Sequence, residues 1–272
     1  MPKSEIKNTK CVLVTGGAGE IGSAICKKFA ANGYAVIATY NSDAKKAEKL
    51  LKDLNLISAE ISNPKSQIPN HSIFQAPTTD PEKIAELEKF LTEKYGKLDV
   101  LVNNAGITTP VPHDDLDGLT DEWIDKIMAT NFKGGFAMVR AMRKLLELSY
   151  QNELSQKRNP ALVVNISSIA GIYGIGSNVA YCASKAAVDS MTRSLARALA
   201  PKIRVVSVSP GFVEGEYTKN FDPAFLKSQM DNTPLERFAQ GEDVAEAVFS
   251  VSEHLTFSTG NIITVDGGRL LN

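Results

Sequence analysis

The sequence predicts an α/β fold in which a doubly wound parallel sheet of about seven strands carries helices on both faces. Short runs rich in valine and isoleucine alternate with longer amphipathic segments, and this alternation is typical of β-α-β units. The runs are nearly continuous in Val, Ile and Leu, as expected for strands that are covered on both faces. The 272 residues, 43% of them hydrophobic, suit one large domain, and we expect residues 1–272 to form it.

The predicted elements follow one another in β-α order along the chain. Seven strands are predicted, beginning at Cys11 (CVLVT), Tyr34 (YAVIATY), His71 (HSIFQ), Leu98 (LDVLVNN), Ala161 (ALVVNIS), Ile203 (IRVVSVSP) and Asn261 (NIITVDG). Amphipathic segments between them predict six helices, beginning near Glu20, Asp43, Asp80, Thr120, Asn178 and Asp222. Residues 55–70 and 149–160 contain proline and polar side chains, and we interpret both stretches as surface connections. The second of them extends the end of the helix from Thr120.

Composition excludes several classes of partner. The formal net charge is −1 and no run of lysine or arginine exceeds two residues, so we expect no nucleic acid and no membrane as a partner. The N-terminal MPKSEIKNTK lacks the apolar segment of a leader, and we expect a cytoplasmic protein. Three scattered cysteines fit a reducing compartment. The three histidines have no metal-ligand spacing, so we expect no metal site.

The stretch VTGGAGEIG, residues 14–22, joins the first predicted strand to the first predicted helix. Glycines allow the backbone to adopt positive φ and to approach a pyrophosphate closely, and a helix N-terminus attracts phosphate. The alternative is a strand-to-helix turn that binds nothing. The strand and helix on either side favour a dinucleotide-binding turn. We therefore predict a Rossmann-type, NAD(P)-binding domain.

A second motif, YCASK, places Tyr181 and Lys185 four residues apart, on one face of a predicted helix. A lysine ammonium beside a phenol favours the phenolate and lowers the tyrosine pKa from its reference near ~10. Tyr181 then becomes a usable acid or base near neutral pH. Ser168, in NISSIAG, ends the fifth predicted strand, at the edge where parallel sheets bind ligands. Taken singly, each residue also fits a structural role.

Together these motifs resemble the short-chain dehydrogenase/reductase family, in its short single-domain branch, over essentially the whole chain. NNAG (103–106) and SPGF (209–212) resemble the markers that follow the fourth and sixth strands of that branch. The branch carries TGxxxGxG in its glycine loop, but Glu20 replaces the middle glycine here. Thr15, Gly16, Gly19 and Gly22 instead match TGxxGxxG, the pattern of the long branch with its epimerases and dehydratases. The other motifs favour the short branch, similar to 3-oxoacyl-carrier-protein reductases and sugar or polyol dehydrogenases.

The resemblance implies an NAD(P)(H)-dependent oxidoreductase that interconverts a ketone and a secondary alcohol by hydride transfer. It implies that Tyr181 exchanges the proton with the substrate oxygen and that Ser168 donates a hydrogen bond to that oxygen. Lys185 would lower the Tyr181 pKa and hold the nicotinamide ribose, and Asn131 would position a water that relays protons. The implied cofactor-binding residues are Thr15, Gly16, Gly19, Ile21, Gly22, Tyr40, Asn41, Ser42, Asn104, Ala105, Gly106, Tyr181, Lys185, Pro210, Gly211 and Val213.

Departures from the family pattern bear on the cofactor. Members that prefer NAD carry an acidic residue at the end of the second strand, where this chain has Tyr40, Asn41 and Ser42. With no carboxylate to repel a 2′-phosphate, NADP(H) is favoured over NAD(H). Gly215 stands where the family carries a threonine that contacts the nicotinamide.

The substrate class and the assembly follow from the resemblance only in outline. We expect a small-molecule carbonyl or alcohol substrate, and a homotetramer or homodimer built on the long helix predicted from Thr120 to Ser149. Two other functions stay open. One is an NAD(P)-sensing regulator with the same fold and little turnover, and the other is a sugar-nucleotide epimerase or dehydratase-like enzyme.

Overall fold

A computed structural model describes residues 9–61, 70–154, 160–216, 218 and 221–271 of the chain. Its centre is a seven-stranded sheet in the order β3-β2-β1-β4-β5-β6-β7, and each pair of adjacent strands is parallel. The strands are β1 (Cys11–Val14), β2 (Ala35–Tyr40), β3 (Ser72–Gln75), β4 (Val100–Asn103), β5 (Ala161–Ile166), β6 (Ile203–Pro210) and β7 (Ile262–Val265). All seven predicted strands are confirmed.

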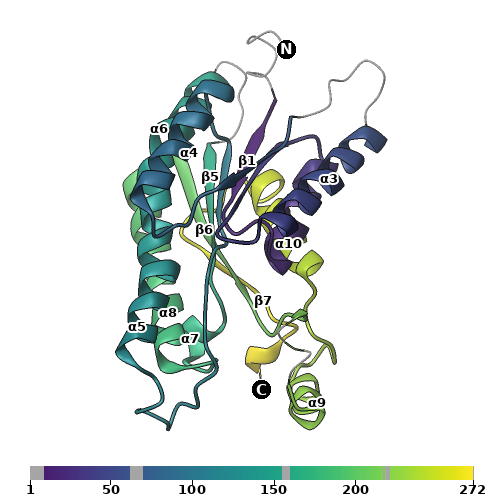
Figure 1. Cartoon of the computed structure of the whole chain (residues 1–272), viewed down its shortest axis with the longest axis vertical. Helices are drawn as coiled ribbons and strands as arrows, with labels where there is room; N and C mark the ends of the chain where they lie inside the picture. The colour runs from purple at the N-terminus through teal and green to yellow at the C-terminus, as the bar shows by residue number, and fades with distance from the viewer. Residues whose placement is uncertain (1–8, 62–69, 155–159, 217, 219–220, 272) are drawn as a thin grey trace.

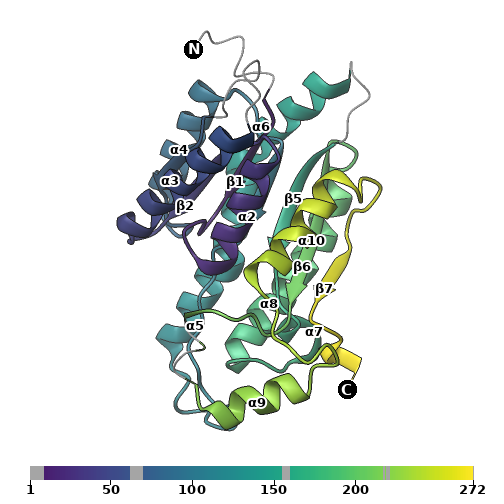
Figure 2. The ribbon, with the colours of Figure 1, turned by 90° about the vertical axis from the view of Figure 1, so that its right-hand side faces the viewer.

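Helices cover both faces of the sheet (Figure 1). On one side lie α2 (Glu20–Ala31), α3 (Ala44–Ile61) and α10 (Gly241–Glu253) (Figure 2). On the other lie α4 (Pro81–Lys94), α5 (Asp121–Met128), α6 (Gly135–Leu154) and α8 (Val179–Leu199). Two shorter helices, α7 (Ala170–Tyr173) and α9 (Pro223–Asp231), lie at the lower end in Figure 1. No helix of the described residues is long and apolar enough to cross a membrane.

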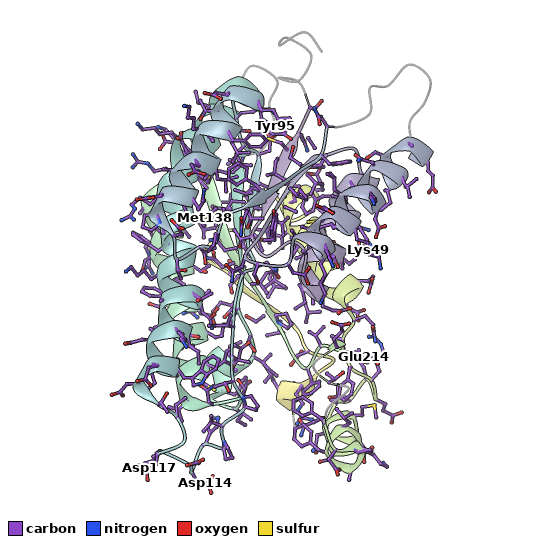
Figure 3. The ribbon with its side chains drawn as sticks, in the orientation of Figure 1. Lys49, Tyr95, Asp114, Asp117, Met138 and Glu214 are labelled. Atoms are coloured by element: carbon purple, nitrogen blue, oxygen red, sulfur yellow. The ribbon has the colours of Figure 1, made fainter. Side chains whose placement is uncertain are left out.

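Each face of the sheet has its own apolar core, because successive strand side chains point to opposite faces. Val12 and Val14 belong to the core under α2 and α10, whereas Leu13 belongs to the core under α4 and α6. Met138 of α6, labelled in Figure 3, is fully buried in the second core. Covering both faces explains why the strands are apolar at nearly every position.

Two predicted helices need correction, and two helices of the structure, α7 and α10, were not predicted. Residues 55–61 are the end of α3 rather than a surface connection, and residues 62–69 lie outside the described residues. The helix predicted from Thr120 to Ser149 is interrupted by a π-helical segment, Ala129–Gly134, and continues as α6 to Leu154. Gln240 and Asp243 form a capping box at the start of α10.

The buried His71 joins the sheet to α3. Its Nδ1 accepts a hydrogen bond from the Val36 N–H at 3.1 Å, and its Nε2 lies 2.7 Å from Ser58 Oγ of α3. Because Nδ1 is an acceptor here, the folded protein requires the neutral ring. Burial lowers the pKa of His71 to about 4.

We expect the free energy of unfolding to fall as the pH is lowered from ~6.5, the usual histidine pKa, towards 4. In this pH window the unfolded chain binds a proton at His71 that the folded chain does not bind. The free energy of unfolding can therefore fall by about 3 kcal/mol. Above pH ~6.5, His71 makes its full contribution to the free energy of unfolding. Urea unfolding at several pH values should show a flatter dependence in His71→Gln. His254→Gln, at an exposed histidine, is the control and should keep the wild-type slope.

Candidate active site

The glycine loop between β1 and α2 is tightly packed. Gly16 has φ +62°, and Gly19 is the N-cap of α2 without a side-chain capping bond. A Cβ atom on Gly22 would lie 2.4 Å from Gly16 O, and one on Gly17 would lie 2.7 Å from Ala38 Cβ. Real Cβ atoms do not approach other atoms so closely, so Gly17 and Gly22 leave no room for a side chain. The first-turn N–H groups of α2 therefore face a loop that allows close approach of a ligand.

Thr15 and Asn104 hold the glycine loop against the loop that follows β4. Thr15 Oγ accepts hydrogen bonds from the N–H groups of Asn104 (2.9 Å) and Ala105 (3.0 Å). Asn104 Nδ2 donates in return to Thr15 O (3.0 Å) and Gly16 O (3.1 Å). Thr15 is buried and does not line the large cleft. Its side chain therefore positions two loops.

One large open cleft gathers nearly all of the predicted site residues at the carboxyl ends of the strands. It is lined by Gly16, Gly19, Ile21, Gly22, Tyr40, Asn41, Ser42, Asn104, Ala105, Gly106, Ser168, Tyr181, Lys185, Pro210, Gly211 and Val213. Of the predicted set, Thr15 and Asn131 line a smaller internal cavity instead. This edge of a parallel sheet is where such folds bind their ligands.

Tyr181, Ser168 and Lys185 converge in this cleft. The side chain of Asn178 caps α8 by accepting the Tyr181 N–H at 2.7 Å, which sets Tyr181 in the first turn of the helix. The Ser168 side chain lies near enough to that of Tyr181 to lower its pKa, and Ser168 Oγ accepts the Ala170 N–H at 3.2 Å. One turn along α8, Lys185 Nζ lies 5.6 Å from the centroid of the Tyr181 ring and donates to Ile166 O at 2.8 Å.

The pKa of Tyr181 is raised rather than lowered, which corrects the prediction from the YCASK motif. Burial raises this pKa, and the nearby Ser168 side chain only partly offsets the effect. Burial also lowers the pKa of Lys185 to about 8, against the attraction of Asp189 one turn further along α8. Burial thus disfavours the charged form of both side chains, and Tyr181 is a protonated phenol at neutral pH.

The π-helical segment brings Asn131 to the loop after β4. Asn131 Oδ1 accepts the Ile107 N–H at 2.8 Å. Its Nδ2 donates to Ile107 O and to Ser184 Oγ, both at 3.0 Å. Both amide hydrogens thus have protein partners, and the side chain holds the loop beside Lys185. The water-positioning role expected of Asn131 stays a prediction. Isolated π turns of this kind are frequent at functional sites.

Sequence reasoning missed one charged residue of the cleft lining, Lys46. Lys46 lies in the first turn of α3, and its Nζ is 3.1 Å from Glu216 Oε2. Lys46 lies four residues after Ser42, a predicted cofactor-binding residue, and this proximity in sequence could have indicated it. Three phenylalanines, Phe212, Phe221 and Phe225, also line the cleft, within a stretch (212–230) that the sequence predicts to line the substrate pocket. The described residues contain no group of three or more His, Cys, Asp or Glu that could hold a metal ion.

Comparison with known proteins gives the same family throughout. A family described as enoyl-(acyl carrier protein) reductase matches residues 16–269. The chain is 33% identical to the 3-oxoacyl-[acyl-carrier-protein] reductase FabG of Thermotoga maritima, with 96% of this chain and 98% of that protein covered. Identity to FabG of Staphylococcus aureus is 32%, with 98% and 100% covered.

Solved structures agree with the sequence comparison. A short-chain dehydrogenase/reductase, glucose/ribitol dehydrogenase, from Brucella melitensis superposes with a TM-score of 0.81 at 26% identity, covering 96% of each chain. The RhlG/NADP active-site complex of Pseudomonas aeruginosa gives a TM-score of 0.83 at 28% identity, covering 97% of this chain and 98% of that one. The chain therefore belongs to the short-chain dehydrogenase/reductase family and is an oxidoreductase that acts on a CH–OH group with NAD or NADP.

Proposed function

We propose that this enzyme reduces a ketone to a secondary alcohol with NADPH and that Tyr181 is the proton donor. The observation that carries the proposal is the convergence of Tyr181, Ser168 and Lys185 in one cleft, with Lys185 Nζ 5.6 Å from the centroid of the Tyr181 ring. When bound, NADPH supplies a hydride to the carbonyl carbon. Tyr181 donates its proton to the carbonyl oxygen. Ser168 donates a hydrogen bond to that oxygen as negative charge develops there.

The residues at the other end of the cleft suit a dinucleotide. The first turn of α2 has no side-chain cap, so its N–H groups are available to a pyrophosphate. Gly22 and Gly16 keep the backbone free of side chains at this point. Gly106 lies where a Cβ would be 3.6 Å from Lys185 Nζ, which leaves space for a ribose beside that ammonium.

Lys46 supports the preference for NADP(H) over NAD(H). Its Nζ lies at the rim of the cleft beyond Tyr40, Asn41 and Ser42, at the end of β2 where an adenosine ribose would sit. Its partner Glu216 is exposed, and exposed ion pairs of this kind contribute about 0–1 kcal/mol. A 2′-phosphate dianion can therefore replace the Glu216 carboxylate as the partner of Lys46.

We expect Lys46→Ala to weaken NADPH binding by about tenfold and to leave NADH binding unchanged, because only NADPH carries the phosphate. Tyr40→Asp should shift preference towards NADH, since a carboxylate accepts bonds from a ribose diol and repels the phosphate. Fluorescence titration with both cofactors measures these changes. Lys45→Ala, at an exposed neighbour that does not line the cleft, is the matched control. Equal losses for both cofactors in Lys46→Ala would contradict the assignment.

The proposed function is tested by cofactor binding followed by a panel of carbonyl substrates. A reductase binds NADPH and oxidises it in the presence of a ketone. A sensor binds the cofactor with no turnover of any carbonyl compound, and that result would overturn the proposal. Relatives named as 3-oxoacyl-[acyl-carrier-protein] reductases favour turnover. Self-association as a homodimer or homotetramer, and a cytoplasmic location, stay predictions.

A further inference from the structure

A wall of aromatic rings closes the cleft beyond the catalytic tyrosine. Phe212 follows β6, Phe221 precedes α9, and Phe225 lies on α9. The ring centroids are 6.1 Å apart for Phe212 and Phe221, 5.5 Å for Phe221 and Phe225, and 6.4 Å for Phe212 and Phe225. Phe238 packs on Phe212 from behind at 4.7 Å and does not line the cleft. The three lining rings thus form one continuous apolar surface in the same cleft as Tyr181.

The opposite side of the same cleft is also apolar. It is lined by Tyr173 of α7, by Ile175 after it, and by Val111 from the loop after β4. Tyr173 is 51% exposed and Ile175 is 75% exposed, although such side chains are usually buried. Figure 1 shows α7 and α9 on opposite sides of the lower end of the molecule. We call the space between these two apolar sides the aromatic chamber; its lining residues are Val111, Tyr173, Ile175, Phe212, Phe221 and Phe225.

Charged side chains near the chamber already have protein partners. Arg269 donates to Gln229 O and to Gln229 Oε1, both at 2.7 Å. Glu214, labelled in Figure 3 on the same side as α9, accepts a bond from Gln240 at 2.6 Å. Asp114 and Asp117 lie at the lower tip of the loop before α5 and do not line the cleft. The charged side chains that line the cleft on this side, Glu214 and Arg269, are therefore already hydrogen-bonded within the protein.

We infer that the aromatic chamber binds an apolar group, aryl or alkyl, carried by the ketone substrate a few bonds from its carbonyl. The inference rests on the proposed function, because it takes the carbonyl to lie at Tyr181. Burial of apolar surface from the ligand and from the exposed rings favours binding. The hydroxyl groups of a sugar or polyol would lose water in the chamber without gaining partners, which disfavours such substrates.

The test compares three ketones with NADPH: 4-phenylbutan-2-one, butan-2-one and dihydroxyacetone. The expected kcat/KM is at least about 100-fold higher for the phenyl ketone than for butan-2-one, since each well-filled pocket group contributes roughly 10–200-fold. Dihydroxyacetone should be the poorest of the three. Phe225→Ala should lower kcat/KM for the phenyl ketone by about tenfold or more, mainly through KM, and should lower it less for butan-2-one, which carries no group to fill the chamber. Phe225→Leu should restore part of the loss.

Phe257→Ala is the matched control, because Phe257 is fully exposed and does not line the cleft. This variant should keep the wild-type kcat/KM for both the phenyl ketone and butan-2-one. Calorimetric binding of 4-phenylbutan-2-one separates the two proposals. Binding that weakens in Phe225→Ala without any turnover would overturn the proposed function and support the chamber. Turnover with dihydroxyacetone equal to the phenyl ketone, or an aryl preference unchanged in Phe225→Ala, would overturn the chamber and leave the reductase standing. Absence of both binding and turnover would overturn both.

Discussion

Replacing Tyr181 with phenylalanine is expected to lower kcat for ketone reduction by about 10²–10⁴-fold or more, because a positioned general acid contributes that much. The change removes only the phenol hydroxyl. The ring would keep its place beside Lys185 Nζ, 5.6 Å from its centroid, so NADPH affinity should stay within about twofold (well under the ~1.4 kcal/mol of a tenfold change). The loss should therefore appear in kcat rather than in cofactor binding.

Stopped-flow oxidation of NADPH and a cofactor titration check this result. Tyr150→Phe, on α6 and away from the cleft lining, removes a comparable hydroxyl and should keep wild-type kcat. Because burial raises the pKa of Tyr181, the acid form persists through neutral pH. Titration of Tyr181 should therefore cause no decline in the rate of reduction at neutral pH, and a decline near pH 8 would report Lys185, whose pKa burial lowers to about 8. Wild-type kcat in Tyr181→Phe would remove Tyr181 from the mechanism.

The sheet could be predicted from the sequence because burial on both faces leaves a local signal. The interior strands are nearly continuous apolar runs, and the chain alternates such runs with amphipathic segments. The pairing of Tyr181 with Lys185 was also local, since both lie on one helix face four residues apart. Convergence of Ser168 with them followed from its place at the carboxyl end of a parallel strand.

Other features depend on contacts between distant parts of the chain. The π-helical segment coincides with the bonds from Asn131 to Ile107 and Ser184, and no periodicity in residues 120–149 indicates it. The raised pKa of Tyr181 reflects its burial in the folded protein, so the motif alone gave the wrong direction. Lys46 meets Glu216 across 170 residues of sequence. Helix α10 begins with a capping box of Gln240 and Asp243, which departs from the usual Ser/Thr-x-x-Glu/Gln signature and so gives little signal in the sequence.

Gly22→Ala should have the largest effect of any single change in the cofactor loop. Its Cβ would lie 2.4 Å from Gly16 O and 2.8 Å from Asn104 Nδ2. Neither neighbour can withdraw easily, because Asn104 Nδ2 donates to Gly16 O at 3.1 Å and holds the two loops together. Overpacking of this kind costs about 1–3 kcal/mol, or several degrees of Tm. The displaced loop should also bind NADPH at least about tenfold more weakly, a change of ~1.4 kcal/mol.

Gly19→Ala is the control that separates crowding from the mere loss of a glycine in the motif. Gly19 has φ −77°, which any residue adopts, and its Cβ would meet only Gly16 O, at 3.3 Å. Thermal unfolding and NADPH titration of both variants should show a clearly smaller change in Gly19→Ala. Glu20, the residue after Gly19, begins α2 at the position where the short-branch pattern has its middle glycine. A small effect of Gly19→Ala would show that the loop tolerates side chains at this end. If Gly22→Ala kept both Tm and affinity, the loop would have room for a side chain, and close approach of backbone to pyrophosphate would not explain its glycines.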